Sequence, residues 1–377
     1  MRRWARAAQA GAWASPIASA RQGWARVEGA SSLPVAARAC FPRLRAHLWN
    51  GRRAAGEAEG EPVRFAVVTA FPESDWHSGR LLAALAERGE ALVVDPARLF
   101  SEIDGAGLHI GDGQGRGCDA FLLARGVSPR GDADAQLTIY RSLEAAGALV
   151  LNRVEALLDA RDKFRTSLLL TAAGVATPRA ALVQSPAQAV AFLRRSPRAV
   201  VKPLAGSLGV GVEKLEAGEG EAAILQRVAS RLAGEGALYL QDFVPNAGRD
   251  LRVFVVGGRV AGSVERVARP GDFRTNMARG ASAHPVRLNR QTEALASRAA
   301  LALGLDYTGI DIVEGPRGPL VIEVNGNPAF DMIFHATGDD MALAIAEHVV
   351  RRVQAQSQAR QRRRARGGRN LRAAREG

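Results

Sequence analysis

The chain has 377 residues, of which 47% are hydrophobic and 5% are aromatic. This composition excludes a fully disordered protein and argues against a surface that stacks nucleic-acid bases. The net charge of +13 belongs to the two ends, because residues 1–60 carry +7 and residues 351–377 carry +9, which leaves −3 for residues 61–350. The high charge therefore says little about what the folded part binds.

The first 60 residues are rich in Ala, Arg and Gly and lack the periodicity of a helix or a strand. An arginine pair and a small-residue site resemble parts of an export signal, but Gly11, Ser15 and Pro16 break the apolar stretch between them. We expect either a disordered basic extension over residues 1–60 or translation that truly begins further along.

The folded part begins near Val63 with alternating strands and helices. Residues 63–69 predict a short buried strand, and residues 78–88 predict an amphipathic helix that Gly89 ends. Three more strands are expected, over 91–94, 120–124 and 147–151. This alternation is typical of a parallel α/β domain, which we place over residues 61–155.

A second region, residues 156–350, predicts a two-lobed domain whose first lobe covers residues 156–245. A helix is expected over 163–173, and strands are expected over 199–203 and 238–244.

The second lobe of that domain covers residues 246–350. Strands over 252–256 and 259–266 flank Gly257 and Gly258, which form a strong hairpin signal. A closing helix is expected before residue 350. Residues 351–377 are polar and arginine-rich, and we expect them to be disordered.

Two cysteines, Cys40 and Cys118, are too few and too distant for a disulfide framework or a metal-ligand motif. They fit a reducing compartment, so we expect a cytoplasmic protein. No apolar run reaches the ~18 residues that a membrane-spanning helix needs, so we expect no membrane contact.

The strongest candidate site lies on two strands, 309–313 and 320–325, that a short turn should pair antiparallel. Glu323 and Asn325 share one strand face, and Asp311 can meet them from the neighbouring strand. Buried carboxylates are costly without a cation, and such hard oxygen ligands suit Mg²⁺ or Mn²⁺. A solvated strand edge, or an ion pair with an arginine, would also explain these residues.

A second candidate is Lys202 with the glycine-rich turn that follows it, which contains Gly206, Ser207, Gly209 and Gly211. A lysine that leaves an apolar strand can reach a phosphate, and glycines let backbone N–H groups approach phosphate oxygens. The lysine precedes the glycines, so this is not a Walker A loop. A plain hairpin loop could have the same composition.

A third candidate is the strand edge formed by Gln241, Asp242, Phe243 and Val244. Its backbone groups could meet an adenine with Phe243 against the ring, although a core strand would look the same. Asp250 could accept a hydrogen bond from a ribose hydroxyl, or it could be an ordinary turn residue.

A fourth candidate is a glycine-flanked loop with Arg266, Arg274, Asn276 and Arg279 around it. Such clusters bind carboxylate or phosphate through bidentate contacts, although a solvated loop would also explain them. The sequence shows no Ser/His/Asp or Cys/His nucleophile arrangement.

These motifs, in this order, resemble the ATP-grasp superfamily and, within it, the RimK-like α-L-glutamate ligases. The resemblance covers about residues 61–350. It rests on Asp-Lys at 162–163, Gly-Val-Ala-Thr-Pro at 174–178, Val-Val-Lys at 200–202, Gln-Asp-Phe-Val at 241–244, Arg-Asp-Leu-Arg at 249–252, Gly-Asp-Phe-Arg-Thr-Asn at 271–276 and Ile-Glu-Val-Asn-Gly-Asn-Pro at 322–328.

The resemblance implies an ATP-grasp fold with ATP between the two lobes of residues 156–350. Lys163 and Lys202 would touch the phosphates. Gln241, Asp242 and Val244 would line the adenine, and Asp250 the ribose. Asp311, Glu323 and Asn325 would hold two magnesium ions. The side chains of the fourth candidate's loop would contact a phosphate or the acceptor, and the first domain would help to bind the acceptor. Asp242 stands where relatives commonly have Glu.

The implied reaction joins L-glutamate to an acceptor carboxylate through an acyl phosphate, with release of ADP and phosphate. The acceptor could be a protein C-terminus or a pterin-type coenzyme. Another amino acid or amine, or a nucleotide- or RNA-binding protein without turnover, remains an alternative. The arginine-rich ends could make weak RNA or ribosome contacts, and relatives suggest a homo-oligomer.

Overall fold

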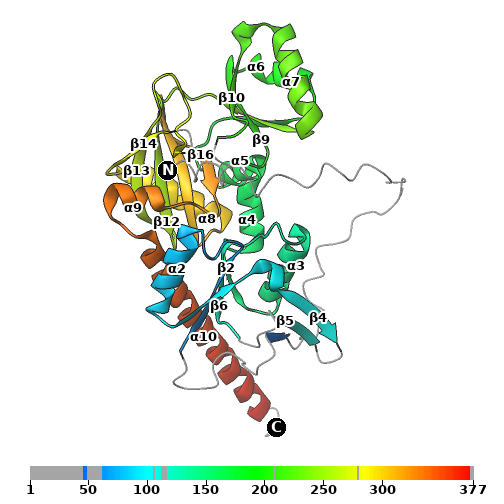
Figure 1. Ribbon diagram of the computed structural model, residues 1–377, viewed down its shortest axis with the longest axis vertical. Helices are drawn as coiled ribbons and strands as arrows, with labels where there is room; N and C mark the ends of the chain where they lie inside the picture. Colours follow the sequence, from blue (N-terminus) through cyan, green and yellow to red (C-terminus); the bar gives the residue numbers. More distant parts are fainter. Residues whose placement is uncertain are drawn as a thin grey trace, which may run out of the picture.

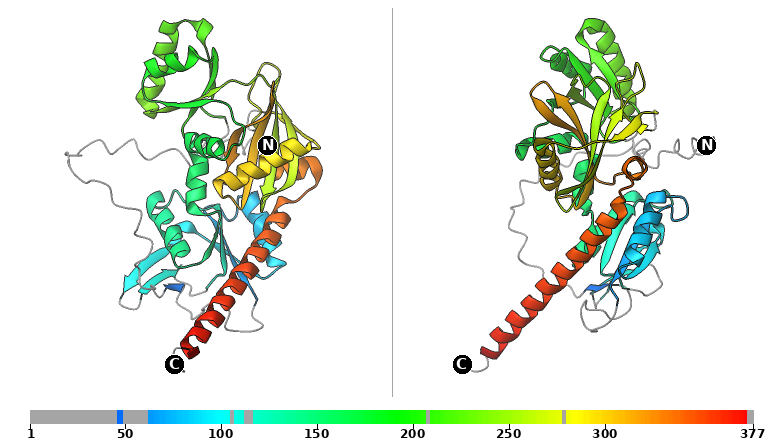
Figure 2. Two further views of the ribbon diagram at one scale, coloured as in Figure 1. Left: turned by 180° about the vertical axis from the view of Figure 1, so that it is seen from behind. Right: turned by 90° about the vertical axis from the view of Figure 1, so that its left-hand side faces the viewer.

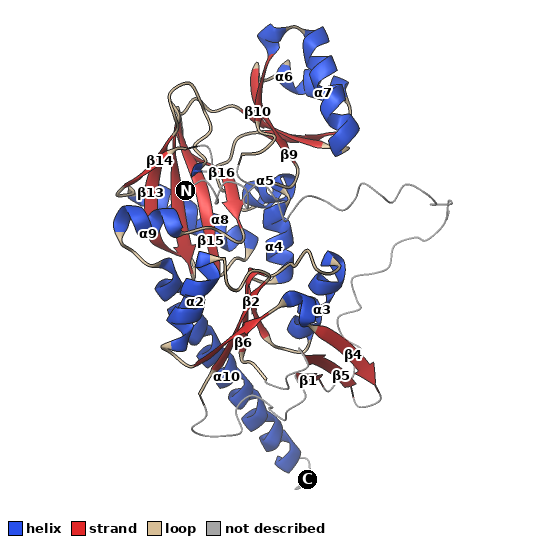
Figure 3. Ribbon diagram, in the orientation of Figure 1, coloured by secondary structure: helices blue, strands red, loops and turns tan. Residues whose placement is uncertain are grey.

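The computed structural model describes residues 46–48, 62–104, 107–111, 117–206, 209–277 and 280–373. Figure 1 shows three bodies along the long axis of the molecule, with a long helix running past the lowest one. The expected α/β class is confirmed, because parallel and antiparallel sheets are both present and helices cover them (Figure 3).

The N-terminal body contains the predicted parallel sheet, in the order β3-β2-β6-β7. Its strands are β2 (Arg64–Thr69), β3 (Glu90–Val94), β6 (Ala120–Arg125) and β7 (Leu149–Leu151). Helices α2 (Trp76–Ala86) and α3 (Ala133–Ala145) belong to this body. Since β3 and β6 flank β2 on opposite sides, the strand order reverses between β2 and β6.

A small second sheet in this body was not predicted. It has the order β1-β5-β4, with β1 (Ala46–Leu48), β4 (Phe100–Asp104) and β5 (Gly107–Gly111). Strand β1 pairs parallel to β5, so the expected disorder of residues 1–60 is wrong for these three residues. The rest of that extension lies outside the described residues.

The next body corresponds to the predicted lobe of residues 156–245. Helices α4 (Val154–Arg161) and α5 (Lys163–Ala172) lead into an antiparallel sheet of order β10-β9-β11-β8. Its strands are β8 (Ala180–Val183), β9 (Arg198–Pro203), β10 (Glu213–Glu216) and β11 (Leu238–Asp242), and helices α6 (Pro186–Leu193) and α7 (Glu221–Glu235) pack against it.

The third body is a five-stranded antiparallel sheet of order β14-β13-β12-β15-β16. The strands are β12 (Arg249–Val256), β13 (Arg259–Val267), β14 (Ser282–Pro285), β15 (Tyr307–Gly315) and β16 (Gly318–Asn325). Val253 and Val255 pack on helix α8 (Arg290–Leu303). Phe254 and Val256 face the other way, toward α9 (Asp331–Thr337) and the N-terminal body, as the two-residue period of a strand requires.

The final helix, α10, runs from Met341 to Ala373. Ala342, Ile345, Val349 and Val353 bury one of its faces in a core shared with the first and third bodies. The expected disorder of residues 351–377 is therefore wrong as far as Ala373, and the last four residues lie outside the described ones. Figure 2 shows the end of α10 projecting beyond the N-terminal body.

The buried contacts of α10 continue past the predicted domain end at residue 350. His348 Nε2 lies 2.7 Å from Asp306 Oδ1, and Arg352 also pairs with Asp306. Further along, Gln356 Nε2 donates to Gly147 O at 2.7 Å. Within the described part of the chain, every helix is too short or too polar to cross a membrane.

Candidate nucleotide and metal site

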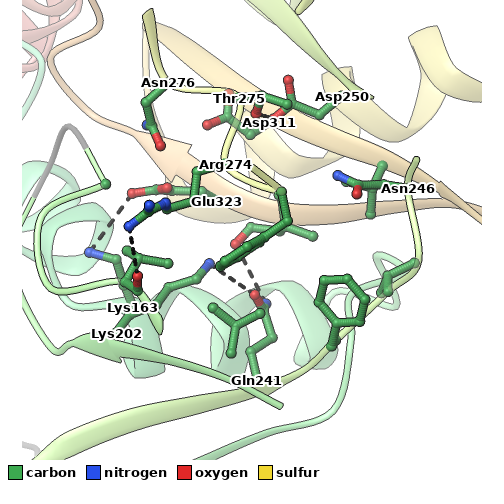
Figure 4. Close-up of a pocket in the computed structure, with 18 of the residues that line it drawn as sticks. Lys163, Lys202, Gln241, Asn246, Asp250, Arg274, Thr275, Asn276, Asp311 and Glu323 are labelled. Atoms are coloured by element: carbon green, nitrogen blue, oxygen red, sulfur yellow. Dashed lines mark hydrogen bonds and ion pairs between the residues drawn. The ribbon is translucent and has the colours of Figure 1, made fainter. Parts of the chain in front are cut away.

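A pocket opens between the β9–β11 sheet and the β12–β16 sheet, and most of the predicted site residues line it (Figure 4). Those residues are Lys163, Lys202, Gly206, Gly209, Gln241, Asp242, Phe243, Val244, Asp250, Arg266, Arg274, Asn276, Asp311 and Glu323. Gly211 and Asn325 are described but do not line the pocket. Ser207 and Arg279 lie outside the described residues.

Two lysines mark one end of the pocket. Lys163 begins α5, where the Asp162 carboxylate caps the helix by accepting from two backbone N–H groups. Its Nζ donates to Gly206 O at 2.9 Å and lies 3.8 Å from Glu323 Oε1. Lys163 therefore joins the glycine-rich turn to the candidate metal strand.

The second lysine, Lys202, is buried on β9, and its Nζ donates to Gln241 Oε1 at 3.0 Å. Burial lowers the pKa of Lys202, although the charge of Glu323 opposes this effect. An ammonium group with an amide oxygen as its nearest partner would be stabilised by a bound anion. A phosphate in this pocket would supply that anion.

The predicted pairing of the candidate metal strands is correct, because Asp311 lies opposite Glu323 and Gly309 lies opposite Asn325. In this structure Asp311 is held by arginines, with Oδ1 2.9 Å from Arg252 Nε and 3.0 Å from Arg266 Nη2. The ion-pair alternative thus describes the contacts of Asp311 in this structure.

The donor set still fits a hard divalent cation. Among the described residues, Asp311 Oδ1 is buried without a hydrogen bond, and Glu323 Oε1 lies 3.8 Å from Lys163 Nζ. No three His, Cys, Asp or Glu side chains in the described ranges gather closely enough to hold a metal alone. Two carboxylates and an amide would need further oxygens, such as those of phosphates, to complete a magnesium shell.

Asp250 is almost fully enclosed by its own partners. Arg266 donates to both of its carboxylate oxygens, at 2.7 and 2.6 Å, and Thr275 Oγ1 donates at 2.6 Å. Burial, aided by the charge of Asp311, raises the pKa of Asp250 despite the opposing charge of Arg266. The carboxylate is engaged with the protein, and its contact with a ribose stays a prediction.

Arg252 does not line the pocket but pairs with Asp311, which does, and the sequence reasoning gave Arg252 no role. Its side chain is buried, and its Nε lacks a hydrogen bond within the described chain. A Cβ added to Gly309 would lie 2.6 Å from Arg252 Nη1, so the guanidinium lies directly over that glycine. The signal was present, because Arg252 and Asp250 are two residues apart and share a strand face.

The other end of the pocket is apolar and aromatic. Val200, Val313 and Ile322 line it together with Phe243 and Phe273, whose rings meet edge to face at 6.0 Å. Apolar and aromatic side chains of this kind suit a nucleobase, and Lys214 Nζ lies 4.2 Å and 4.6 Å from the ring centres of Phe243 and Phe273.

Asp242 directs its carboxylate to Arg179 at 3.2 Å. The shortened side chain is therefore engaged by an arginine in this structure.

Arg274 connects the two sides of the pocket. Its guanidinium is paired with Asp272, at 2.9 and 3.1 Å, and Nη1 donates to Val212 O at 3.3 Å. Val212 follows the glycine-rich turn, so the predicted loop of residues 271–276 contacts the opposite lobe. Asn276, from the same loop, also lines the pocket.

Comparison with known proteins identifies the architecture. The model of the RimK-like ATP-grasp domain matches residues 160–349. A "Probable alpha-L-glutamate ligase" from Thioalkalivibrio sulfidiphilus is 36% identical over 272 residues, which cover 71% of this chain and 88% of that protein. The "Tetrahydromethanopterin:alpha-L-glutamate ligase" of Methanosarcina acetivorans is 34% identical over 292 residues, which cover 71% of this chain and 84% of that protein.

A solved structure shares the fold. It is the ATP-grasp ligase PsnB, complexed with minimal precursor, Mg and ADP, which matches with a TM-score of 0.60 over 77% of this chain and 98% of its own. Because the sequence identity is only 21%, this match supports a shared fold and carries no argument about function. From the family model and the curated relatives, the chain belongs to the RimK-like ATP-grasp family and is an ATP-dependent ligase that forms C–N bonds.

Proposed function

We propose that this protein joins the amine of L-glutamate to an acceptor carboxylate through an acyl phosphate. One observation carries the proposal: two lysines and two carboxylates from different lobes converge in one pocket. Lys163 and Lys202 would hold phosphates, whereas Asp311 and Glu323 would hold a cation that the phosphates also bind. The apolar and aromatic side chains that line the same pocket are suited to the adenine.

In the first step, the γ-phosphoryl group of ATP passes to an oxygen of the acceptor carboxylate and ADP leaves. Activation is needed because a carboxylate resists nucleophiles and its oxygen is a poor leaving group. Lys163, Lys202 and the turn with Gly206 and Gly209 would hold the phosphates. Arg252 and Arg266 lie beside Asp311, where they can balance the negative charge of the reacting groups.

In the second step, the amine attacks the acyl carbon, phosphate leaves and an amide forms. Positioning and charge stabilisation suffice for both steps, and no side-chain nucleophile is required. Arg274 and Asn276 line the same pocket, and we propose that they and Arg279 contact the phosphate or the acceptor.

The metal assignment is Mg²⁺ or Mn²⁺, as two ions held by Asp311, Glu323 and Asn325. Such ions neutralise negative charge between phosphates during phosphoryl transfer. Asp311 would exchange part of its pairing with Arg252 or Arg266 for the ion. Asn325 would turn toward the pocket from its present position, where its Nδ2 donates to Gly309 O at 3.2 Å.

The names of both curated relatives favour L-glutamate as the amino acid. The acceptor is a protein C-terminus or a pterin-type coenzyme, and the second is favoured by the name of the Methanosarcina relative. We also propose that the protein works in the cytoplasm, where ATP and free amino acids are available. A homo-oligomer and weak RNA contacts by the basic ends stay predictions.

The test is to incubate the purified protein with ATP, Mg²⁺ and isotope-labelled L-glutamate in a desalted extract of the source cells, supplemented with the small-molecule fraction of the same cells after its free amino acids have been removed. Mass spectrometry then locates the label. Label on a protein C-terminus or on a small molecule supports the proposal and identifies the acceptor class. Absence of label, while another labelled amino acid is incorporated, would remove glutamate from the assignment.

A further inference from the structure

A cluster of charged side chains lies outside the nucleotide pocket, at the carboxyl ends of β2 and β6. These are the two strands between which the order of the parallel sheet reverses. In open α/β sheets, ligands bind outside the carboxyl ends of the strands at such a point. Arg125 is the last residue of β6, and the chain after β2 leads to His77 in the first turn of α2.

The cluster is joined to the end of the candidate metal strand. Asn327, two residues after Asn325, accepts from Arg125 Nη1 at 3.3 Å and donates to Leu123 O at 3.2 Å. Arg125 Nη2 also lies 3.3 Å from Asp75 Oδ1. The guanidinium is thus fixed beside the segment that connects the metal strand to α9.

His77 separates a cation from a carboxylate. Its Nδ1 lies 3.4 Å from Arg125 Nη2, and its Nε2 lies 3.4 Å from Asp331 Oδ1. The Arg125 side chain is 23% exposed and that of Asp331 is 49% exposed. Both charged groups therefore reach solvent, on opposite sides of one imidazole ring.

We propose that Arg125 and Asp331 flank a subsite for the α-amino acid whose amine attacks the activated carboxylate. The arginine would bind the α-carboxylate through its fork of N–H donors, and Asp331 would bind the α-ammonium group. This inference rests on the proposed function and names the residues that recognise its second substrate.

The charge pattern favours an amino acid over the acceptor. A guanidinium on one side of His77 and a carboxylate on the other match the opposite charges of an amino-acid zwitterion. The reacting carboxylate of the acceptor must instead meet the γ-phosphate near Lys202 and Glu323. Asn327, which accepts from Arg125, is two residues from Asn325 at the end of the candidate metal strand.

The experiment compares the wild-type protein with Arg125→Gln, Arg125→Lys, Asp331→Asn and a control, Arg80→Gln. Arg80 lies on the same helix as His77 and pairs with Asp340, also between the first and third bodies, but outside the cluster. Incorporation of labelled L-glutamate in the supplemented extract gives the KM for glutamate. Binding of a non-hydrolysable ATP analogue gives a separate Kd, and 4-aminobutyrate, which lacks the α-carboxylate, serves as competitor.

We expect Arg125→Gln and Asp331→Asn each to raise the KM for glutamate at least tenfold, with the nucleotide Kd within twofold of wild type. Arg125→Gln should also lose the preference for glutamate over 4-aminobutyrate, whereas Arg125→Lys should keep part of it. Arg80→Gln should behave as wild type.

Two negative outcomes are distinct. Incorporation by the wild type with an unchanged glutamate KM in the Arg125→Gln and Asp331→Asn variants would overturn the subsite and leave the proposed function intact. Absence of glutamate incorporation by the wild type itself would contradict the proposed function, and the subsite with it.

Discussion

Arg252 and Asp311 lie opposite each other on the paired strands β12 and β15, with Nε 2.9 Å from Oδ1. Both are buried, and within the described chain neither of these two atoms makes a hydrogen bond. Burial lowers the pKa of Arg252, while the charge of Asp311 acts in the opposite direction. A buried pair in poor hydrogen-bonding geometry is costly, so the arrangement is suited to partners that arrive with the substrates.

Gly309→Ala tests whether the guanidinium of Arg252 must lie over β15. The new Cβ would meet Arg252 Nη1 at 2.6 Å and the Cβ of Pro328 at 2.9 Å, so one of them must move. We expect turnover to fall at least tenfold, with a loss of about 1–3 kcal/mol in the free energy of unfolding. Gly79→Ala is the matched control, because a Cβ there meets nothing within 4 Å.

Asp250→Asn tests the buried pair with Arg266. The substitution leaves Arg266 buried with less compensating charge, so we expect a loss of about 3–5 kcal/mol in the free energy of unfolding, measured by denaturant titration. Arg249→Gln removes an exposed ion pair with Glu265 on the same two strands and should cost less than about 1 kcal/mol. Equal effects of the two variants would contradict the account of Asp250.

Some parts of this site could be predicted from the sequence and others could not. The pairing of Asp311 with Glu323 followed from strand alternation and a short turn, which are local properties. An ion pair of Asp311 with an arginine was an alternative from the sequence, but the sequence did not say which arginine, because Arg252 and Arg266 come from β12 and β13 and meet Asp311 only in the folded sheet.

The same contrast applies to the fold. The parallel strands were predicted from apolar runs, whereas β4 was missed because Ser101, Glu102 and Asp104 make it polar and exposed. The helix after residue 350 was missed because its many arginines make this part of the sequence look polar throughout. The apolar face that packs in the core ends at Val353. Burial of that face depends on the N-terminal body, which local sequence does not reveal.

The last helix gives a prediction for shortened chains. A chain that ends at residue 350 loses the packing of Val353, the pairing of Arg352 with Asp306 and the hydrogen bond from Gln356 to Gly147. We expect it to unfold at a clearly lower temperature than a chain that ends at residue 362. Coincident thermal transitions would show that these contacts add no stability.

The stability of the His77 cluster should depend on pH. Burial would lower the pKa of His77, but its contacts with Asp331 and Asp75 outweigh burial and the charge of Arg125, so the pKa is raised. The stabilisation is therefore fully present below the ordinary histidine pKa and is lost as pH rises through the raised folded value. His77→Gln should lower the free energy of unfolding more at pH 6 than at pH 9, and a difference that is constant with pH would contradict this.

The most direct test of the central claim measures how much ADP and phosphate form for each labelled L-glutamate incorporated. The reaction is run with ATP for the wild type and for Glu323→Gln. We predict one ADP and one phosphate for each glutamate incorporated by the wild type. Glu323→Gln should keep the fold, but its rate should fall by roughly 100-fold or more, as expected when a main electrostatic stabiliser is removed. Formation of AMP in place of ADP, or normal turnover by Glu323→Gln, would contradict the acyl-phosphate mechanism or the metal assignment, respectively.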